Sequence, residues 1–294
     1  MNYEYLKVFY LVCEYHNFSK AAKELYTSQP AISRIISSLE AELSTKLFLR
    51  TKSGVMLTKE GERLYQMIEI PFNQLSRIEK DIQNFSKAVD ADIYIGATLT
   101  SLECYVFDLV KSLQGQFPNI HYQIYTGSTT KILDMVDKGK IDFAFVTTPF
   151  KIEQDLELYQ IKKIEDVIIA GNNYKNKINS PLSIKDLINY PLILLSKDNQ
   201  FRVHIDSFAA KYNIIFHPEY ETDSVGVITP MVEKNYGLAF IPKEMALEAI
   251  KDEKCFIIDL LEKAPKRNIT LVTRTHSTKS NIFSMVKDTI INKK

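Results

Sequence analysis

The chain has 294 residues, enough for two domains, and its content of 45% hydrophobic and 25% charged residues is ordinary for a globular protein. This composition excludes a disordered chain, and no apolar run reaches the ~18 residues that a transmembrane helix needs. The 37 basic and 36 acidic side chains give a net charge of +1, which excludes a polyanion-binding protein that is basic throughout but allows a local basic patch.

Residues 1–58 are predicted to form three short helices followed by a small hairpin. Apolar side chains recur every three or four residues in the first two helices, which is the spacing of a helix that buries one face. Asn17 or Ser19 is expected to cap the second helix, and the third is expected to run from Ser28 to about residue 43. The turn "KSG" between two β-capable segments predicts a hairpin over residues 46–58.

The third helix carries an apolar stripe and, beside it, a polar face. At about 3.6 residues per turn, Gln29, Ser33 and Ser37 lie on one face without an apolar side chain, and Arg34 lies further round. A short polar break separates this helix from the one that carries Ala21-Ala22, whose small side chains let two helices cross closely. This is the geometry of a helix-turn-helix, whose second helix reads base edges in the major groove. Spacing alone leaves open the alternative that the polar face is only solvated.

Residues 59–89 are predicted to form one long linker helix. Its apolar side chains repeat every three or four residues and form a stripe that needs a partner. The stripe comprises Leu64, Ile68, Leu75, Ile78 and Ile82. Pro71 lies inside the helix and is expected to kink it, because proline has no N–H to donate to the helical ladder. We expect this helix to pair with the same helix of a second copy.

From residue 90 onward, alternating strand and helix patterns predict a mainly parallel sheet with helices on its faces. The expected strands are 91–97, 120–127, 141–148, 190–196, 214–220, 237–242 and 268–274. The pattern forms two successive blocks, which predict two lobes. Lobe I is expected to cover about residues 90–161 together with 268–294, because the last strand and helix return to it. Lobe II is expected to cover about residues 162–267.

Hydroxyl-rich turns follow three of the expected strands: "ATLTS" at 97–101, "TGSTT" at 126–130 and "VTTP" at 146–149. In open parallel sheets, ligands bind beside the carboxyl ends of the strands, where the following helices present free N–H groups. Hydroxyls and N–H groups suit a carboxylate or another anion. Serine and threonine also cap helices, so each residue alone has a structural explanation. Three such turns at corresponding strand ends favour a binding site.

The segment from residue 17 to residue 61 resembles the N-terminal signature of the LysR-type transcriptional regulators. The matching positions are Phe18-Ser19, Ala21-Ala22, Leu25, Ser28-Gln29-Pro30-Ala31, Ser33, Leu39-Glu40, Leu43, Leu47-Phe48, Arg50, Leu57-Thr58 and Gly61. More loosely, "LVKSLQGQFPNI", "ILDMVDKGKIDFAFV" and "MVEKNYGLAFIP" resemble runs of that family's effector domain. The resemblance implies an N-terminal winged helix-turn-helix (all-α with a small β wing), a long dimerising linker helix and an α/β effector domain of two lobes like type 2 periplasmic binding proteins. Such proteins commonly assemble as tetramers.

The helix-turn-helix pattern and the resemblance together predict which residues contact double-stranded promoter DNA. They are Ser19, Ser28, Gln29, Pro30, Ser33, Arg34, Ser37, Arg50 and Lys52. Arg50 and Lys52 cluster at the hairpin, as expected of a wing that lies along phosphates. Two residues depart from the family pattern here. Ser44 stands where the family usually has glycine, so the helix end is expected to turn less sharply, and Ile35 adds apolar surface beside the reading helix.

The hydroxyl-rich turns and the resemblance together place a small-molecule effector, anionic or strongly polar, between the two lobes. Its expected contacts in lobe I are Thr98, Thr100, Ser101, Gly127, Ser128, Thr147 and Thr148. Arg202 and Asp223 are further candidates from lobe II, and either could equally be a solvated surface charge.

Catalysis and solute transport are the alternative classes of function. The sequence has no GxSxG, GxGxxG, P-loop or HExxH motif, and its five histidines show no metal-ligand spacing, so no catalytic residue, metal or cofactor is predicted. His204 is expected either near the cleft beside Arg202 or in a structural role. A solute-binding protein would explain residues 90–294 but not residues 1–60. It would also need an export signal, which the charged N-terminus does not resemble.

Cys13, Cys104 and Cys255 are far apart and form no CxxC motif. This usage indicates a reducing, cytoplasmic setting without a disulfide framework or a zinc site. Cys104 leaves two alternatives open: a redox sensor, for which Cys255 is the only possible partner in that domain, or a small core residue. The sequence therefore predicts a cytoplasmic transcriptional regulator, neither an enzyme nor a membrane protein, that binds DNA as a dimer or tetramer and responds to an effector.

Overall fold

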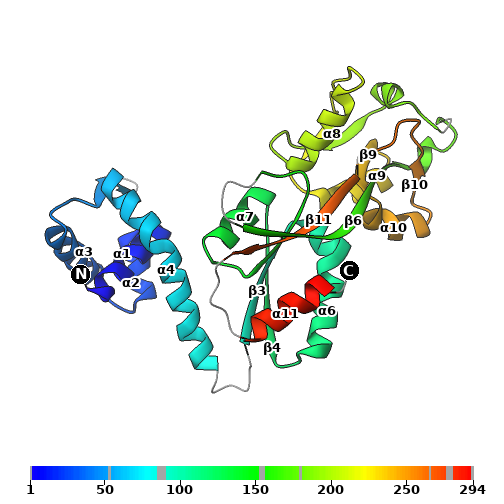
Figure 1. Cartoon of the computed structure of the whole chain (residues 1–294). Helices are drawn as coiled ribbons and strands as arrows, with labels where there is room; N and C mark the ends of the chain where they lie inside the picture. The colour runs from blue at the N-terminus through cyan, green and yellow to red at the C-terminus, as the bar shows by residue number, and fades with distance from the viewer. Residues whose placement is uncertain are drawn as a thin grey trace. The chain divides into compact units, whose positions relative to one another are not determined.

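The computed structural model describes residues 2–51, 54–84, 91–151, 156–178, 181–264, 266–275 and 281–292. The chain divides into two compact units, Met1–Lys87 and Ala88–Lys294 (Figure 1). Among the described residues, no helix is both long enough and apolar enough to cross a membrane.

The first unit contains short helices, a hairpin and one long helix. Its elements are α1 (Tyr3–Tyr15), α2 (Phe18–Glu24), α3 (Gln29–Glu42), β1 (Phe48–Thr51), β2 (Gly54–Leu57) and α4 (Lys59–Asn84). Asn17 caps α2, because its Oδ1 accepts hydrogen bonds from the backbone N–H groups of Ser19 (2.8 Å) and Lys20 (3.0 Å). Ser28 caps α3 in the same way through the N–H of Ala31 (3.4 Å). The antiparallel pair β1–β2 forms the predicted hairpin.

Helices α1, α2 and α3 pack around one small apolar core. Phe9 of α1, Ala21 of α2 and Ile32 of α3 have no exposed surface. Because Ala21 and Ala22 have no side chain beyond Cβ, α2 can approach its neighbours closely. Helices α2 and α3 with the turn between them form the predicted helix-turn-helix, and the hairpin forms its wing.

A buried carboxylate joins the end of α3 to the hairpin. Oε2 of Glu40 lies 2.6 Å from Nζ of Lys46, and Oε1 accepts hydrogen bonds from the backbone N–H groups of Leu47 (2.9 Å) and Phe48 (3.3 Å). Burial acts to raise the pKa of Glu40, but these hydrogen bonds outweigh burial and hold the pKa below its usual value. Gly61 packs against the same segment, since a Cβ there would lie 2.2 Å from the carbonyl oxygen of Leu47.

The end of α3 turns sharply although it has no glycine. Ser44 adopts a left-handed conformation with φ of 53°. Its N–H donates to the carbonyl of Ala41 (3.2 Å), and the N–H of Thr45 donates to the carbonyl of Glu40 (3.0 Å). This is the bonding pattern of a helix that ends in a glycine. The expectation of a less sharp turn is therefore wrong, because serine adopts the conformation at a cost of about 1–2 kcal/mol.

Helix α4 uses part of its apolar stripe within the first unit. Ile68 and Phe72 are buried in the core of α1–α3, and Leu64 packs partly buried beside them. The expectation that Ile68 faces a second copy is therefore wrong, because the core of the first unit already covers it, while the pairing of the half-buried Leu64 stays a prediction. The helix continues through Pro71 to Asn84, and the expected kink stays a prediction.

A second apolar stripe of α4 is exposed. Met67, Leu75 and Ile78 are 68%, 41% and 53% exposed. With Pro71, which is also exposed, they recur at positions i, i+4, i+8 and i+11 and so share one helix face. The side chain of Ile82 lies outside the described residues. An exposed apolar stripe of this kind is typical of a surface that another molecule covers.

The second unit is built on one mixed nine-stranded sheet, with the order β4-β3-β5-β11-β6-β9-β7-β8 and β10 paired with β6. The strands are β3 (Ala91–Ala97), β4 (Ile120–Thr126), β5 (Phe143–Thr147), β6 (Leu156–Gly171), β7 (Leu192–Leu195), β8 (Tyr220–Thr222), β9 (Leu238–Pro242), β10 (Cys255–Ile258) and β11 (Lys266–Arg274). Strand β3 pairs in parallel with β4 and β5, as does β7 with β8 and β9. Every pair that includes β6 or β11 is antiparallel.

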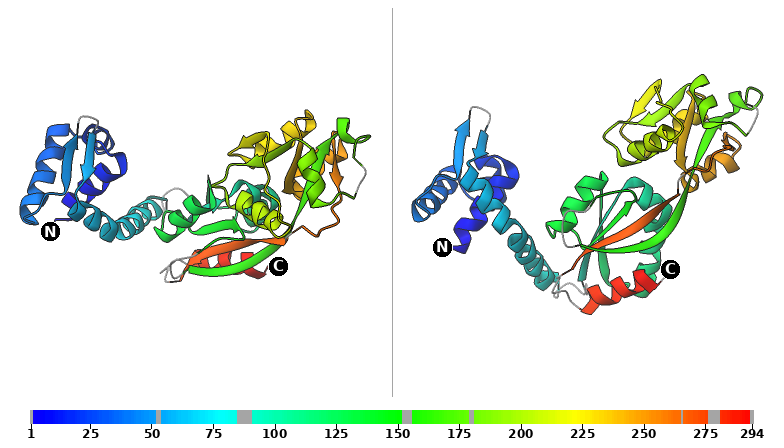
Figure 2. Two further views of the ribbon diagram at one scale, coloured as in Figure 1. Left: turned by 90° about the horizontal axis from the view of Figure 1, so that it is seen from above. Right: turned by 45° about the horizontal axis from the view of Figure 1, so that its top comes forward.

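The two long strands β6 and β11 carry the chain between two lobes, where they run side by side (Figure 2). The sequence did not predict β6 or β10, so the sheet is less parallel than expected. The segment 214–220 contributes only its last residue to a strand, β8. Pro218 lies in that segment and has no N–H to donate to a ladder, although Ile214 and Phe216 are still buried.

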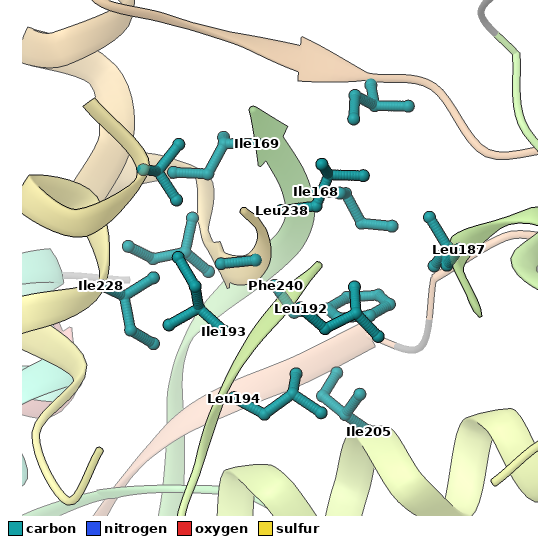
Figure 3. Close-up of a cluster of buried hydrophobic side chains, with 14 of the residues drawn as sticks. Ile168, Ile169, Leu187, Leu192, Ile193, Leu194, Ile205, Ile228, Leu238 and Phe240 are labelled. Carbon is teal, nitrogen blue, oxygen red and sulfur yellow. The ribbon is translucent and has the colours of Figure 1, made fainter. Parts of the chain in front are cut away.

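Helices pack against the sheet in both lobes (Figure 1). They are α5 (Leu99–Ser101), a π-helical turn (Leu102–Val106), α6 (Phe107–Gln116), α7 (Thr129–Asp137), α8 (Gln200–Ala210), α9 (Ile228–Glu233), α10 (Lys243–Lys251) and α11 (Asn281–Asn292). Phe283, Val286 and Ile290 of α11 pack into the core of lobe I, which confirms that the last helix returns there. Lobe II has its own core, in which Ile193 and Phe240 lie among other apolar side chains (Figure 3).

Candidate functional site

The exposed face of α3 forms an open polar groove. Its lining residues are Gln29, Pro30, Ser33, Arg34, Ser37 and Ser38. The opposite face of the helix is buried through Ile32, Ile36 and Leu39. The structure therefore places the predicted reading residues of α3 together on the surface that the core leaves free.

The other predicted DNA contacts lie around this groove or outside the described residues. Ser19 is exposed in the first turn of α2, and Ser28 is exposed at the start of α3, where its hydroxyl already serves as the cap. The side chain of Arg50 and all of Lys52 lie outside the described residues. Their contact with phosphates stays a prediction.

The sequence analysis did not single out Tyr26, which lies in the turn between α2 and α3. It adopts a left-handed conformation with φ of 51°, and 98% of its surface is exposed. Its N–H donates to the carbonyl of Lys23 (3.1 Å), and the N–H of Thr27 donates to that of Ala22 (2.9 Å), so the turn is well bonded. The sequence signal that could have identified Tyr26 as a surface residue of interest is a large aromatic side chain within a polar turn.

A polar cavity of about 610 Å³ lies between the two lobes of the second unit. Lobe I lines it with Thr98, Leu99, Thr100, Thr126, Gly127, Ser128, Thr129, Thr130 and Thr147. Lobe II lines it with Leu195, Asp198, Asn199, Gln200, Phe201, Asp223, Ser224 and Val225. The lobe I residues lie at the carboxyl ends of β3, β4 and β5, which is where the hydroxyl-rich turns predicted a site.

Two of the predicted hydroxyls line the cavity and also cap helices. Thr98 Oγ1 accepts from the N–H of Ser101 (3.3 Å), and Ser128 Oγ accepts from the N–H of Lys131 (3.3 Å). Thr100 differs, because it is only 7% exposed and its hydroxyl hydrogen-bonds to no other described residue. Thr129, which the sequence analysis did not single out, is 8% exposed, and its hydroxyl also hydrogen-bonds to no other described residue. Hydroxyls that line a cavity and have no protein partner are suited to bind a ligand.

Three predicted effector contacts do not line the cavity. Ser101 is fully buried, and its hydroxyl hydrogen-bonds to that of Thr98 (3.0 Å). Thr148 Oγ1 accepts from the N–H of Asn268 (2.9 Å) and so fastens β5 to β11. These two predictions are wrong for a physical reason: within each turn, some hydroxyls point into the protein and complete its own hydrogen bonds.

Arg202 is the third, and it is neither in the cavity nor a solvated surface charge. It is 3% exposed, and its Nε donates to both carboxylate oxygens of Asp206 (3.0 and 2.8 Å). Its Nη1 donates to the carbonyl of Leu195 (2.7 Å) and to Glu221 (2.9 Å). The side chain thus joins α8 to the sheet of lobe II.

Asp198 and Asp223 give the lobe II side of the cavity its charge. Both side chains are exposed, and neither forms an ion pair with another described residue. No lysine or arginine is among the described residues that line the cavity. Asp223 therefore lies where the sequence placed it, but its neighbour there is a second carboxylate rather than an arginine.

Behind the cavity, a buried ion pair joins β6 and β11, the two strands that run between the lobes. Arg267 of β11 is 1% exposed, and its Nε and Nη2 donate to the carboxylate of Asp166 on β6 at 2.6 and 2.5 Å. Its Nη1 donates to Thr147 Oγ1 of lobe I (3.1 Å), and its Cζ lies 4.0 Å from the centroid of the Phe201 ring of lobe II. Because Thr147 and Phe201 both line the cavity, Arg267 contacts one wall residue from each lobe.

His204 and the cysteines have structural surroundings. Burial, with Arg267 nearby, lowers the pKa of His204, which does not line the cavity. Cys104 packs in the core of lobe I, where burial raises its pKa to about 12, and Cys255 packs in the separate core of lobe II. The pair needed for a two-cysteine sensor is therefore not formed. Within the described part of the chain, no group of three metal-ligating side chains occurs.

A winged helix-turn-helix in one unit and a two-lobed α/β fold in the other define the class of DNA-binding transcriptional regulators. The family model for the LysR substrate binding domain matches residues 88–290. The model for the bacterial regulatory helix-turn-helix protein of the lysR family matches residues 3–62. The chain belongs to the LysR family of transcriptional regulators.

Known proteins are similar to the chain over nearly its whole length. It is 26% identical to the HTH-type transcriptional regulator BbuR of Bordetella bronchiseptica, over 96% of this chain and 87% of that protein. Its fold is similar to full-length CbnR complexed with its target DNA, with a TM-score of 0.73, 17% identity and coverage of 100% of this chain and 99% of that one. It is also similar to the effector binding domain of QuiR in complex with shikimate, with a TM-score of 0.61, 21% identity and coverage of 69% and 96%. Membership of this family indicates a regulatory role.

The ion pair behind the cavity gives a stability prediction. Arg267→Met is expected to lower the free energy of unfolding of the full chain by about 3–5 kcal/mol, because Asp166 is left buried and unpaired. The double variant Asp166→Asn with Arg267→Met removes both charges and is expected to lose less. Urea unfolding followed by circular dichroism measures both. A double variant that is less stable than the single one would contradict the role assigned to the pair.

Proposed function

We propose that this LysR-family regulator changes its action on promoter DNA when a small polar molecule occupies the cavity between the two lobes. The observation that carries the proposal is the cavity wall itself, where Thr100 and Thr129, two largely buried residues, present hydroxyls without partners among the described residues. The effector binding domain of QuiR, which has a similar fold, was solved in complex with shikimate. This supports a ligand in the corresponding domain here.

The reading surface for DNA is proposed to be the groove on α3. Gln29, Ser33 and Arg34 offer amide, hydroxyl and guanidinium groups at the first turns of the helix, the groups that read base edges in a major groove. The similar fold of CbnR, solved with its target DNA, supports this assignment. Binding to chromosomal DNA would place the protein in the cytoplasm of a bacterial cell.

The protein is proposed to act as a dimer or tetramer through the exposed stripe of α4. Met67, Leu75 and Ile78 form an apolar surface that a second copy of α4 would remove from water. The stripe is separate from Ile68 and Phe72, which the first unit already uses. Pairing through this stripe would therefore leave the helix-turn-helix core intact.

DNA recognition should depend on the groove of α3. Gln29→Ala and Ser33→Ala are expected to reduce discrimination between operator and random DNA, because each lost base contact costs roughly 1–3 kcal/mol. Arg50→Ala and Lys52→Ala are expected to weaken binding to both DNAs and to flatten its salt dependence. Gel shifts on operator and scrambled duplexes measure this. An equal loss on both DNAs for Gln29→Ala would make α3 a phosphate contact.

Assembly should depend on the exposed stripe of α4. Leu75→Asp with Ile78→Asp is expected to yield smaller species in light scattering, because pairing would bury unpaired charge. The control is Gln66→Asp with Ser76→Asp, which adds the same charge to exposed positions on another face of α4. An unchanged oligomer in the stripe variant, or equal dissociation in both, would refute the assignment.

Effector binding should depend on the lobe I wall. A thermal-shift screen of small polar carboxylates that includes shikimate identifies a ligand of the full chain. Thr100→Val is then expected to weaken that ligand by about 1.5–3 kcal/mol and to abolish the reporter response while operator binding persists. Ser128→Ala should also lose about 0.5–2 kcal/mol of stability, since Ser128 caps α7. Lower stability with unchanged affinity in both variants would show that these residues serve the fold alone.

A further inference from the structure

The cavity between the lobes has two walls of different electrostatic character. The lobe I wall is made of hydroxyls and the N-terminal end of α7, where backbone N–H groups carry partial positive charge. The lobe II wall carries the carboxylates of Asp198 and Asp223, which pair with no basic group among the described residues. A ligand that spans the cavity meets donors on one side and two negative charges on the other.

We propose that the effector is a zwitterion, such as an α-amino acid, with its carboxylate at the lobe I wall and its ammonium group between Asp198 and Asp223. This inference rests on the proposed function and adds the chemical class of the ligand. Thr100 and Thr129 are largely buried residues whose hydroxyls have no partner among the described residues, and these hydroxyls donate to the carboxylate together with the nearby N–H groups. The two aspartates accept charge-assisted hydrogen bonds from the ammonium group.

A simple anion fits the cavity less well than a zwitterion. The guanidinium of Arg267 behind the wall already donates to Asp166 and Thr147, so its charge is neutralised and those donors are used. An anion without an amine would bring a third negative charge near Asp198 and Asp223, with no basic side chain on the described lining to offset it. An ammonium group on the same ligand removes that repulsion.

Asp198 also has a possible structural role, because it stands just before the cap of α8, where a carboxylate is favoured by the helix dipole. Asp223 has the same possible role, because it precedes Ser224, after which the 3-10 turn Val225–Val227 continues directly into α9. Ligand affinity, and not stability alone, therefore has to be measured for both residues.

The first test measures the Tm of the full-length chain with the L-α-amino acids that have uncharged side chains. Each is compared with its N-acetyl derivative, which is only an anion, and its amide, which is only a cation. At least one amino acid is expected to raise the Tm well above both of its derivatives. A panel in which an N-acetyl derivative is as effective as its parent, or in which no amino acid raises the Tm, overturns the inference.

The second test measures the Kd of the best amino acid by calorimetry. Asp223→Asn and Asp198→Asn are each expected to raise it about 10- to 100-fold, the equivalent of one lost charge-assisted hydrogen bond. Asp288→Asn is the matched control, because it removes the same charge from an exposed residue of α11 that does not line the cavity. Wild-type affinity in both cavity variants, even with a lower Tm for Asp198→Asn, overturns the inference.

Thr100→Val separates failure of this inference from failure of the proposed function. If Thr100→Val weakens binding while both aspartate variants bind normally, the cavity is the effector site but lobe II does not read a cation. If all three variants bind as the wild type does, the ligand binds elsewhere, and the proposed function fails together with the inference.

Discussion

The second unit depends on the buried contact between Arg267 and Asp166. The two residues lie on β11 and β6, the strands that carry the chain between the lobes, and they are almost completely removed from water. Isolated charges at that depth would be strongly destabilising, so each requires the other. The same guanidinium also contacts Thr147 of lobe I and Phe201 of lobe II. A single side chain thus links the two strands between the lobes to one residue of each cavity wall. The cavity is thus shaped by the contact that holds the lobes together.

The first unit relies on a smaller contact of the same kind. Glu40 ends the apolar face of α3 with a buried carboxylate that accepts hydrogen bonds from the start of the hairpin. Helix α3 and the hairpin are therefore fixed relative to each other through ordered backbone donors rather than through apolar packing alone. DNA recognition needs that fixed geometry, since base contacts and phosphate contacts must be met at the same time.

The sequence predicted what depends on local pattern and missed what depends on long-range pairing. The helix-turn-helix and the hydroxyl-rich strand ends could be predicted because spacing and caps are local properties. Strand β6 could not, since its first half has polar residues on its solvent side, and its place is set by β11, about a hundred residues later. For the same reason Arg202 was placed in the cavity and Arg267 was overlooked. A charged side chain shows its burial only through partners that the fold supplies.

The position of Arg267 also constrains how an effector can act. A ligand shifts a conformational equilibrium only by binding one state better than another. A ligand that contacts the lobe I hydroxyls alone gains the same interactions whatever the position of lobe II. One that also reaches Asp198 and Asp223 gains its full affinity only when both walls stand at the right separation. Thr147 of lobe I and Phe201 of lobe II both contact Arg267. A change in the distance between the two walls must therefore alter the packing around the buried pair of Arg267 and Asp166. Two-sided recognition is therefore the feature that would let occupancy of this cavity select one arrangement of the lobes.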